Sequence, residues 1–181
     1  HKGFRVVLDA DIQGFSDQTP HQVIMTGLRN VVADGKILNL IERFLSAGVM
    51  EDGVTYPTTV GTPQGGVLSP LLANIALNVL DWHLDKAGFH FVRYADDFVI
   101  FTRSRRAAER VFRSVNRYLT RHLRLVVNET KSRIVEADGV EYLSFVFRGR
   151  RATINVSEKS FQKFKRRIRK LTGRSRGISM D

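Results

Sequence analysis

The sequence predicts an α+β domain in which helices cover an antiparallel sheet. Short β-branched runs and amphipathic segments follow one another in the order strand, helices, hairpin, helix, strand pair, helix, strands, helix. Helices segregated over an antiparallel sheet are typical of this class. The 181 residues are 43% hydrophobic, so the chain is long and apolar enough for one packed domain and part of a second.

The N-terminal segment predicts a strand followed by a helix. Residues 4–12 are β-branched and end in an alternating pattern, which places Asp9 and Asp11 on one face of a strand. Thr19 precedes a proline and has the position of an N-cap, so a helix is expected over residues 19–30.

Two further helices are predicted from apolar residues at helical spacing. The first covers residues 34–48 and the second covers residues 69–88, with Ser69 as its N-cap. A hairpin around Asp52-Gly53 lies between them. The apolar positions of the first helix are Ile37, Leu40, Ile41, Phe44 and Leu45. Those of the second are Leu72, Ile75, Val79 and Trp82.

The second half of the chain predicts a strand pair, a helix, several strands and a final helix. Residues 90–102 favour two strands joined at Asp96 and Asp97, and residues 105–123 form an amphipathic pattern. Strand-like runs cover residues 123–128, 132–137, 141–149 and 151–156, and a closing helix covers residues 157–171.

The charge of the chain favours an anionic partner. The net charge is +11, and twelve lysines and arginines lie between Arg148 and Arg176 against one acid, Glu158. Such a segment suits a phosphate backbone, although a solvated helix face has the same composition. The chain has no cysteine, which excludes disulfides, thiolate metal sites and cysteine nucleophiles. No run approaches the roughly 18 apolar residues that a membrane span needs.

Three aspartates are the candidate chemical centre. Asp11 ends the first strand, and Asp96 and Asp97 lie between two strands, so the three carboxylates converge if those strands are neighbours. Clustered carboxylates repel one another unless a cation is present, and Mg²⁺ is the hard cation that such oxygens bind. Two ions about 3.5–4 Å apart serve in-line phosphoryl transfer. Adjacent aspartates are also common in ordinary turns.

A glycine-rich stretch precedes the helix at residue 69. Gly61, Gly65 and Gly66 allow close approach of the backbone to another group, and Pro63 stiffens the loop. Backbone amides next to a helix N-terminus suit an anion or a nucleotide. A simple glycine-rich turn before a helix fits the same pattern.

Five motifs together resemble the reverse transcriptases (maturases) of bacterial group II introns. They are DADIQGFSD, GTPQGGVLSPLLANIALNVLD, RYADDFVIF, LRLVVNETKSRIV and EYLSFVFRG, in this order. The resemblance implies a polymerase palm with a ferredoxin-like or RRM-like core, helices on one face of the sheet, and fingers and thumb largely missing. It places the palm at residues 1–155 and a basic helix that begins the thumb or a linker at residues 156–181.

The resemblance implies a role for each residue that matches a motif. Asp11 and Asp96 would bind two Mg²⁺ ions, for which Mn²⁺ can substitute, and Asp97 would support them. The Ile12 carbonyl would be a backbone ligand of the metal. Lys131 would lie behind the leaving pyrophosphate, although a surface lysine is an equal interpretation.

Further site residues follow from the same resemblance. The expected nucleotide pocket comprises Gln13, Gly14, Phe15, Ser16, Gln64 and Gly65. The expected support for the primer end comprises Tyr142, Leu143, Ser144 and Phe145. The expected contacts with nucleic acid are Arg93, Lys163, Arg166, Arg167 and Lys170. Ser16 departs from the aromatic residue usual in the family, so ribose discrimination would depend on Phe15, and Ser144 stands where the family generally has glycine.

The function implied is RNA-directed DNA polymerisation. The partners would be an RNA template or intron RNA, a DNA primer and deoxynucleoside triphosphates, with no membrane, in a bacterial cytoplasmic ribonucleoprotein. The chain opens almost directly into a strand without an initial methionine, so we expect an excised palm with little activity of its own. The alternative is an RNA-binding maturase module that assists splicing without polymerisation. A cyclase with a similar sheet is a third possibility, which the TPQGGVLSP stretch disfavours.

Overall fold

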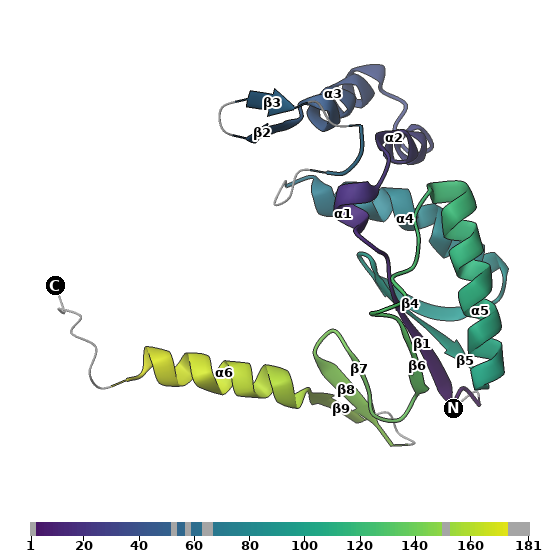
Figure 1. The fold of residues 1–181 in the computed structure, drawn as a ribbon, viewed down its shortest axis with the longest axis vertical. Coiled ribbons are helices and arrows are strands. Elements are labelled where there is room, and N and C mark those ends of the chain that lie inside the picture. The colour runs from purple at the N-terminus through teal and green to yellow at the C-terminus, as the bar shows by residue number, and fades with distance from the viewer. Residues whose placement is uncertain (1–2, 52–53, 57–58, 63–66, 150–152, 174–181) are drawn as a thin grey trace. The chain divides into compact units, whose positions relative to one another are not determined.

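The computed structural model describes residues 3–51, 54–56, 59–62, 67–149 and 153–173 (Figure 1). The chain divides into two compact units, one spanning Gly3–Val135 and the other beginning at Glu136. The predicted division into a palm over residues 1–155 and the start of a thumb or linker after it is a statement about domain identity. A division by compactness does not test that prediction. No helix in the described ranges is long and apolar enough to span a membrane.

The first unit is built on a four-stranded sheet of order β4-β5-β1-β6. Strand β1 pairs antiparallel with β5, and β5 pairs antiparallel with β4. The strands are β1 (Val6–Asp11), β4 (His90–Tyr94), β5 (Asp97–Thr102) and β6 (Arg133–Glu136). The predicted strand pair around the two aspartates is therefore confirmed, and β1 lies beside it.

Helices α4 (Ser69–Lys86) and α5 (Arg105–Tyr118) cover one face of this sheet (Figure 1). Val6, Leu8 and Ala10 of β1 share a core with both helices. Because successive side chains of a strand point to opposite faces, Asp9 and Asp11 lie on the other face. The α+β fold with helices on one face is confirmed, and it leaves the acidic positions away from the core.

A small helical region precedes α4. It comprises α1 (Phe15–Gln18), α2 (His21–Arg29), α3 (Gly35–Ser46), β2 (Val49–Glu51) and β3 (Val54–Tyr56). Strands β2 and β3 form the predicted hairpin, whose Asp52-Gly53 turn lies outside the described residues. Helix α2 lies against both α3 and α4.

Two helix starts and two buried stripes differ from the prediction. The N-caps are Pro20 and Leu68, one residue away from the predicted Thr19 and Ser69. The buried face of α4 is rotated around the helix axis from the predicted one, so that Trp82 is 57% exposed. The small side chains of Ala73 and Ala76 permit close packing on the face that is buried. The buried residues of α4 are Leu72, Ala73, Ala76, Leu77, Leu80 and Leu84. In α3, Leu45 is the only one of the predicted apolar positions that is buried.

The connection from α5 to β6 is less regular than predicted. Helix α5 continues into a π-helical turn over Leu119–Leu123. The strand expected over residues 123–128 is reduced to one bridge, between Ile12 and Val127. Asn128 ends the pairing because its side-chain oxygen accepts hydrogen bonds from the backbone of the next residues, including Thr130 N at 3.1 Å.

The second unit consists of a three-stranded sheet and a helix. Its elements are β7 (Val140–Tyr142), β8 (Phe145–Arg148), β9 (Thr153–Val156) and α6 (Glu158–Leu171). The single strand predicted over residues 141–149 is broken, because Leu143 and Ser144 have φ values of 49° and 70° and form a hairpin turn. Ser157 caps α6, as its hydroxyl accepts a hydrogen bond from Ser160 N.

Candidate active site

The acidic ends of β1 and β5 form the candidate site. Asp11 is the last residue of β1, Asp97 is the first residue of β5, and the two are register partners. Directly opposed residues of an antiparallel pair project from the same face of the sheet. Asp96 precedes Asp97 in the β4–β5 turn. The predicted meeting of the first-strand aspartate with the aspartate pair is therefore present in the fold.

Asp97 shows the electrostatic consequence of this crowding. Its pKa is raised, first by desolvation at the end of the sheet, although part of the side chain remains exposed to solvent. The neighbouring charges of Asp96, Asp11 and Asp9 raise it further, as does a side-chain hydrogen bond with Asp11. A site that disfavours another negative charge favours a cation.

Two basic side chains, one just before β6 and one at its first residue, balance the acids. The Lys131 ammonium lies 3.2 Å from Asp11 Oδ2, and Arg133 Nε lies 2.8 Å from Asp9 Oδ2. Asp11 Oδ2 is buried and accepts no hydrogen bond from the described residues, and the Lys131 ammonium is the cation that lies beside it. Lys131 was expected beside a leaving pyrophosphate, and the structure places it at the acidic cluster itself.

The donor set fits a hard divalent cation. A buried carboxylate oxygen without a hydrogen bond needs positive charge close to it, and carboxylates are the ligands that Mg²⁺ takes from proteins. Asp11, Asp96 and Asp97 are the residues that would hold it. In the described part of the chain, however, no three metal-binding side chains are grouped closely enough to ligate one ion. Ile12 is buried and forms a β-bridge with Val127. The role of its carbonyl as a metal ligand stays a prediction.

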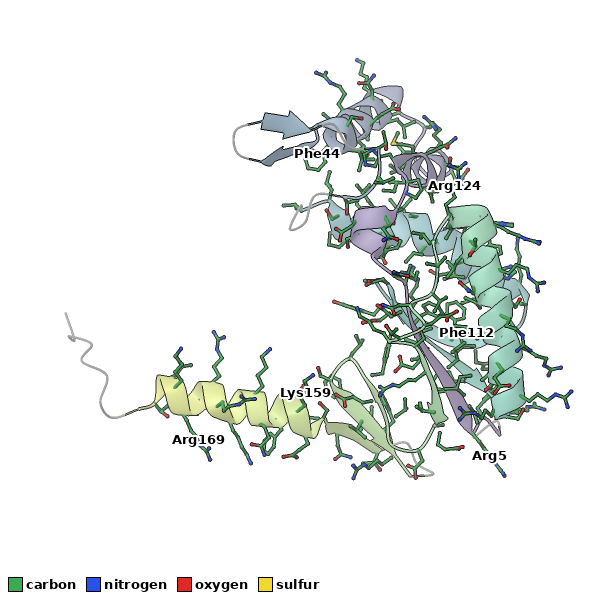
Figure 2. The ribbon with its side chains drawn as sticks, viewed as in Figure 1. Arg5, Phe44, Phe112, Arg124, Lys159 and Arg169 are labelled. Atoms are coloured by element: carbon green, nitrogen blue, oxygen red, sulfur yellow. The ribbon has the colours of Figure 1, made fainter. Side chains whose placement is uncertain are left out.

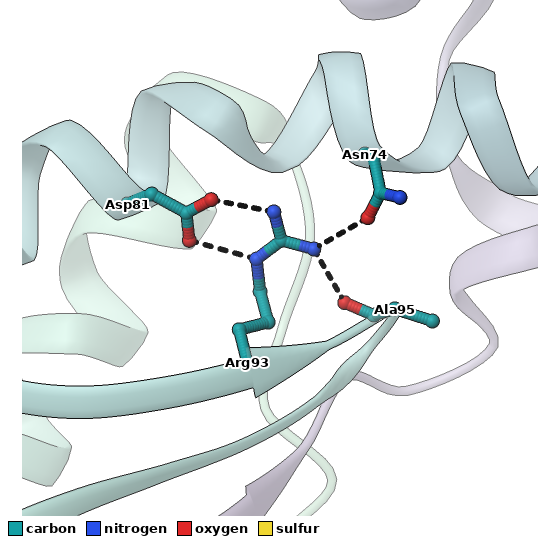
Figure 3. Close-up of polar contacts among 4 residues, drawn as sticks. All are labelled: Asn74, Asp81, Arg93 and Ala95. Atoms are coloured by element: carbon teal, nitrogen blue, oxygen red, sulfur yellow. Dashed lines mark hydrogen bonds and ion pairs between the residues drawn. The ribbon is translucent and has the colours of Figure 1, made fainter.

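Arg93 of β4 reaches toward Asn74 and Asp81 of α4 and toward the Ala95 carbonyl (Figure 3). Its side chain is 9% exposed and forms two hydrogen bonds with Asp81, of 2.7 and 2.5 Å. Nη1 donates to Asn74 Oδ1 at 3.0 Å and to the Ala95 carbonyl at 2.8 Å. This placement argues against the expected contact between Arg93 and nucleic acid, because the guanidinium is already committed to α4 and to the turn.

The Arg93 contacts fix the backbone next to Asp96. Ala95 has a φ of 53°, an uncommon conformation for a residue with a side chain. The sequence did not point to Asn74 and Asp81 as the partners of Arg93. Their seven-residue spacing, which places two polar residues on the same side of α4, is the signal that could have found them.

The turn between β1 and α1 contains most of the expected nucleotide pocket. Gln13, Gly14 and Ser16 are exposed, which is compatible with that role. Phe15 is 4% exposed and belongs to the core, so its side chain is poorly placed to screen a ribose. Gln64 and Gly65 lie outside the described residues.

The start of the glycine-rich stretch is tied to this turn. Thr62 N donates to Ser16 O at 2.7 Å, and Gly61 N donates to Thr19 O at 2.8 Å. Gly61 has a φ of +82°, and an added Cβ would lie 2.9 Å from the Asp17 carbonyl oxygen. Glycine is thus required at Gly61, and the stretch begins beside the predicted nucleotide turn.

The remaining predicted residues belong to the second unit. Leu143, Ser144 and Phe145 are exposed at the β7–β8 turn, and Tyr142 is half-buried. The four predicted basic contacts of α6 are exposed on one side of the helix. They are Lys163, Arg166, Lys170 and Arg167. Their exposure is compatible with nucleic-acid binding.

Comparison with known sequences identifies relatives of the chain. A family model described as "Reverse transcriptase (RNA-dependent DNA polymerase)" matches residues 1–147. Protein YkfC of Escherichia coli K12 is 27% identical over 181 aligned residues, which cover 81% of this chain and 46% of that protein. The group II intron-encoded protein LtrA of Lactococcus lactis is 48% identical over 80 residues, or 44% of this chain and 13% of LtrA. The chain therefore spans less than half of these relatives.

Comparison with solved structures supports the fold. Telomerase from Candida albicans, solved with a fragment of telomeric RNA, has a TM-score of 0.69 and 15% sequence identity, and the match covers 93% of this chain and 34% of that chain. Apo telomerase from Candida tropicalis has a TM-score of 0.65 at 11% identity, covering 84% and 33% respectively. At these identities the likeness concerns the fold alone.

Proposed function

The chain belongs to the reverse transcriptase family, and from this premise we propose that it is the palm of an RNA-directed DNA polymerase of the group II intron type. The observation that carries the proposal is the register pairing of Asp11 with Asp97, which brings the two acidic motifs together beside Asp96. The high identity to LtrA over 80 residues supports the group II type.

The proposed reaction extends a DNA primer on an RNA template with deoxynucleoside triphosphates. Reverse transcriptases generally use divalent metal ions. A pair of Mg²⁺ ions would supply activation of the attacking oxygen and stabilisation of the leaving group. Asp11 and Asp96 would hold them, with Asp97 beside them. The raised pKa of Asp97 and the buried Asp11 oxygen both favour cation binding at this place.

Lys131 has two compatible roles in this proposal. In the structure its ammonium balances Asp11 at 3.2 Å. With Asp11 neutralised by a bound metal, the Lys131 side chain, 69% of which is exposed, would be able to turn toward a negatively charged phosphate. Lys131 would thus hold the charge balance of the site before metal binding and contribute to pyrophosphate departure after it.

Primer extension by the protein that carries this palm tests the proposal. Asp96→Asn replaces one carboxylate with an amide of nearly the same size. Under a two-metal mechanism, primer extension should therefore fall by several orders of magnitude. Asp85→Asn, at an exposed carboxylate near the end of α4, is the matched control and should extend normally. Equal extension by wild type and Asp96→Asn would remove the polymerase assignment and leave the RNA-binding maturase alternative.

A further inference from the structure

Helix α5 and its flanks carry a concentration of positive charge separate from that of α6. Residues 103–124 contain eight arginines, no lysine and a single acid, Glu109. All eight arginines are exposed.

Four of these residues form a continuous line, here called the arginine stripe. Arg106, Arg110, Arg113 and Arg117 recur at intervals of four, three and four residues, which puts them on one side of α5. They extend over roughly 16 Å of helix axis at about 1.5 Å per residue. In Figure 2, side chains tipped with nitrogen project from α5 on the side away from the sheet.

The stripe is unbalanced within the described part of the chain. The ion pair of α5 joins Arg105 to Glu109 at 3.7 Å, and no stripe arginine has an ion pair or a side-chain hydrogen bond there. Like charges three and four residues apart destabilise a helix by about 0.2–0.5 kcal/mol for each pair. Bound anions would remove this repulsion.

The stripe and the acidic cluster lie on opposite sides of the sheet. Val111 and Val115 of α5 share the core with Leu8 and Ala10 of β1. Asp11 lies on the other face of that strand, because side chains alternate. The stripe faces solvent on the outer side of α5. A segment of nucleic acid that is bound at the carboxylates therefore does not contact the stripe at the same time.

The chemistry of the stripe selects its partner. Arginine binds phosphate with a planar, two-pronged set of donors, which lysine cannot match. The aromatic rings of α5 are engaged elsewhere: Tyr118 is stacked on His83 with ring centroids 3.8 Å apart, and Phe112 packs against the core. No ring is left to stack on bases from the stripe. The apolar side of α5 is buried in the core, so it cannot insert into a membrane.

We propose that the arginine stripe binds the phosphate backbone of double-helical RNA, at a surface distinct from the polymerase site. This proposal rests on the proposed function only because that function identifies RNA as the nucleic acid. Recognition would depend on the spacing of phosphates and not on base sequence. The surface would hold a folded region of an RNA while the opposite face of the sheet contains the reacting strands.

Binding of a labelled RNA hairpin with a fully paired stem tests this proposal. Anisotropy over a series of salt concentrations would compare wild type with the triple variant Arg110→Gln, Arg113→Gln, Arg117→Gln. We expect affinity to fall about tenfold or more, and the slope of log K against log salt to decrease by about 2 to 3, since each lost phosphate contact removes nearly one unit.

A variant of equal charge separates the stripe from net charge alone. Arg5→Gln, Arg29→Gln, Lys86→Gln removes three exposed positive charges elsewhere in the same unit and should leave the slope near its wild-type value. Circular dichroism of both variants would show that they fold. Equal losses in the two variants would overturn the proposal, because the effect would then be one of overall charge.

Two further measurements make the outcome specific. Vesicles containing phosphatidylserine should not bind through the stripe, and a loss of vesicle binding with unchanged RNA binding would overturn the RNA assignment. A single-stranded RNA of the same length should show a smaller difference between variant and wild type than the hairpin. The assay measures no polymerisation, so its failure leaves the polymerase proposal standing, and failed primer extension leaves the stripe standing.

Discussion

At the scale of single residues, Arg93 links the helix layer to the acidic turn. Its guanidinium binds Asp81 with two hydrogen bonds and reaches the Ala95 carbonyl, one residue before Asp96. From the sequence alone, the arginine of the RYADD motif was predicted to contact nucleic acid, because charged side chains usually lie at the surface. Only the fold shows that Asp81 is close enough to neutralise it.

Replacing Arg93 tests this supporting role. Arg93→Lys keeps the charge but cannot form the same set of directed hydrogen bonds, so the turn should lose its fixed geometry. We expect kcat for primer extension to fall about tenfold or more with little change in KM, since small displacements of reacting groups have effects of this size. Asp81→Asn should act in the same direction. Normal kcat in a folded Arg93→Lys protein would contradict the role.

At the scale of elements, the β7–β8 turn shows a local conflict between sequence and backbone. Ser144 has a φ of 70°, in the region where glycine is favoured, and Leu143 before it has a φ of 49°. The strand predicted over residues 141–149 ends here because two successive left-handed residues reverse the chain.

Ser144→Gly should stabilise this hairpin. A left-handed conformation costs a residue with a side chain roughly 1–2 kcal/mol, and the greater freedom of glycine in the unfolded chain offsets part of the gain. We expect a net increase of about 0.5 kcal/mol in the free energy of unfolding, measured with urea. Ser144→Ala keeps the strain and should show no such increase, and equal stability of the two variants would contradict the explanation.

Three adjacent rings at the contact between α4 and the π-helical turn should make the stability of the protein depend on pH. Tyr118 lies between His83 and His122, with ring centroids 3.8 and 4.3 Å away. Burial lowers the pKa of His83, and the charge of His122 lowers it further. The folded state therefore binds a proton at His83 less readily than the unfolded chain, whose histidines titrate near about 6.5.

This difference makes folding less favourable in acid. Stability should be unaffected by His83 well above pH about 6.5 and should fall as the pH drops below that value, until the lowered folded pKa is passed. Urea unfolding between pH 7.5 and 5.5 measures the effect. His83→Gln should lose less stability over this interval than wild type. The same loss in both proteins would assign the effect to other groups.

At the scale of the whole molecule, the sequence predicted the order and class of the elements and the meeting of Asp11 with the aspartate pair. These features depend on local periodicity and on five motifs that stand in the same order as in group II intron reverse transcriptases. The partners of Lys131 and Arg93 could not be predicted, because both are set by packing between distant segments. The shifted face of α4 and the opposite placement of α5 and Asp11 likewise required the tertiary arrangement.

The same arrangement gives the first unit two sides of opposite charge. The ends of β1 and β5 present carboxylates on one face of the sheet, and α5 presents arginines beyond the other. Under the two proposals, the chemistry would take place on the first side and RNA would be held on the second. The central claim concerns the first side, where Lys131 balances the charge of Asp11 and where we propose that a divalent cation binds.

Calorimetric titration of the 181-residue chain with Mn²⁺ tests that claim most directly. Wild type should bind the ion, Asp11→Asn and Asp96→Asn should lose binding, and Asp85→Asn should behave as wild type. Lys131→Gln should bind more tightly than wild type, because the ammonium 3.2 Å from Asp11 Oδ2 competes for the same oxygen. Binding that is indifferent to Asp11→Asn and Asp96→Asn, or weakened by Lys131→Gln, would contradict a metal site at the meeting of β1 and β5.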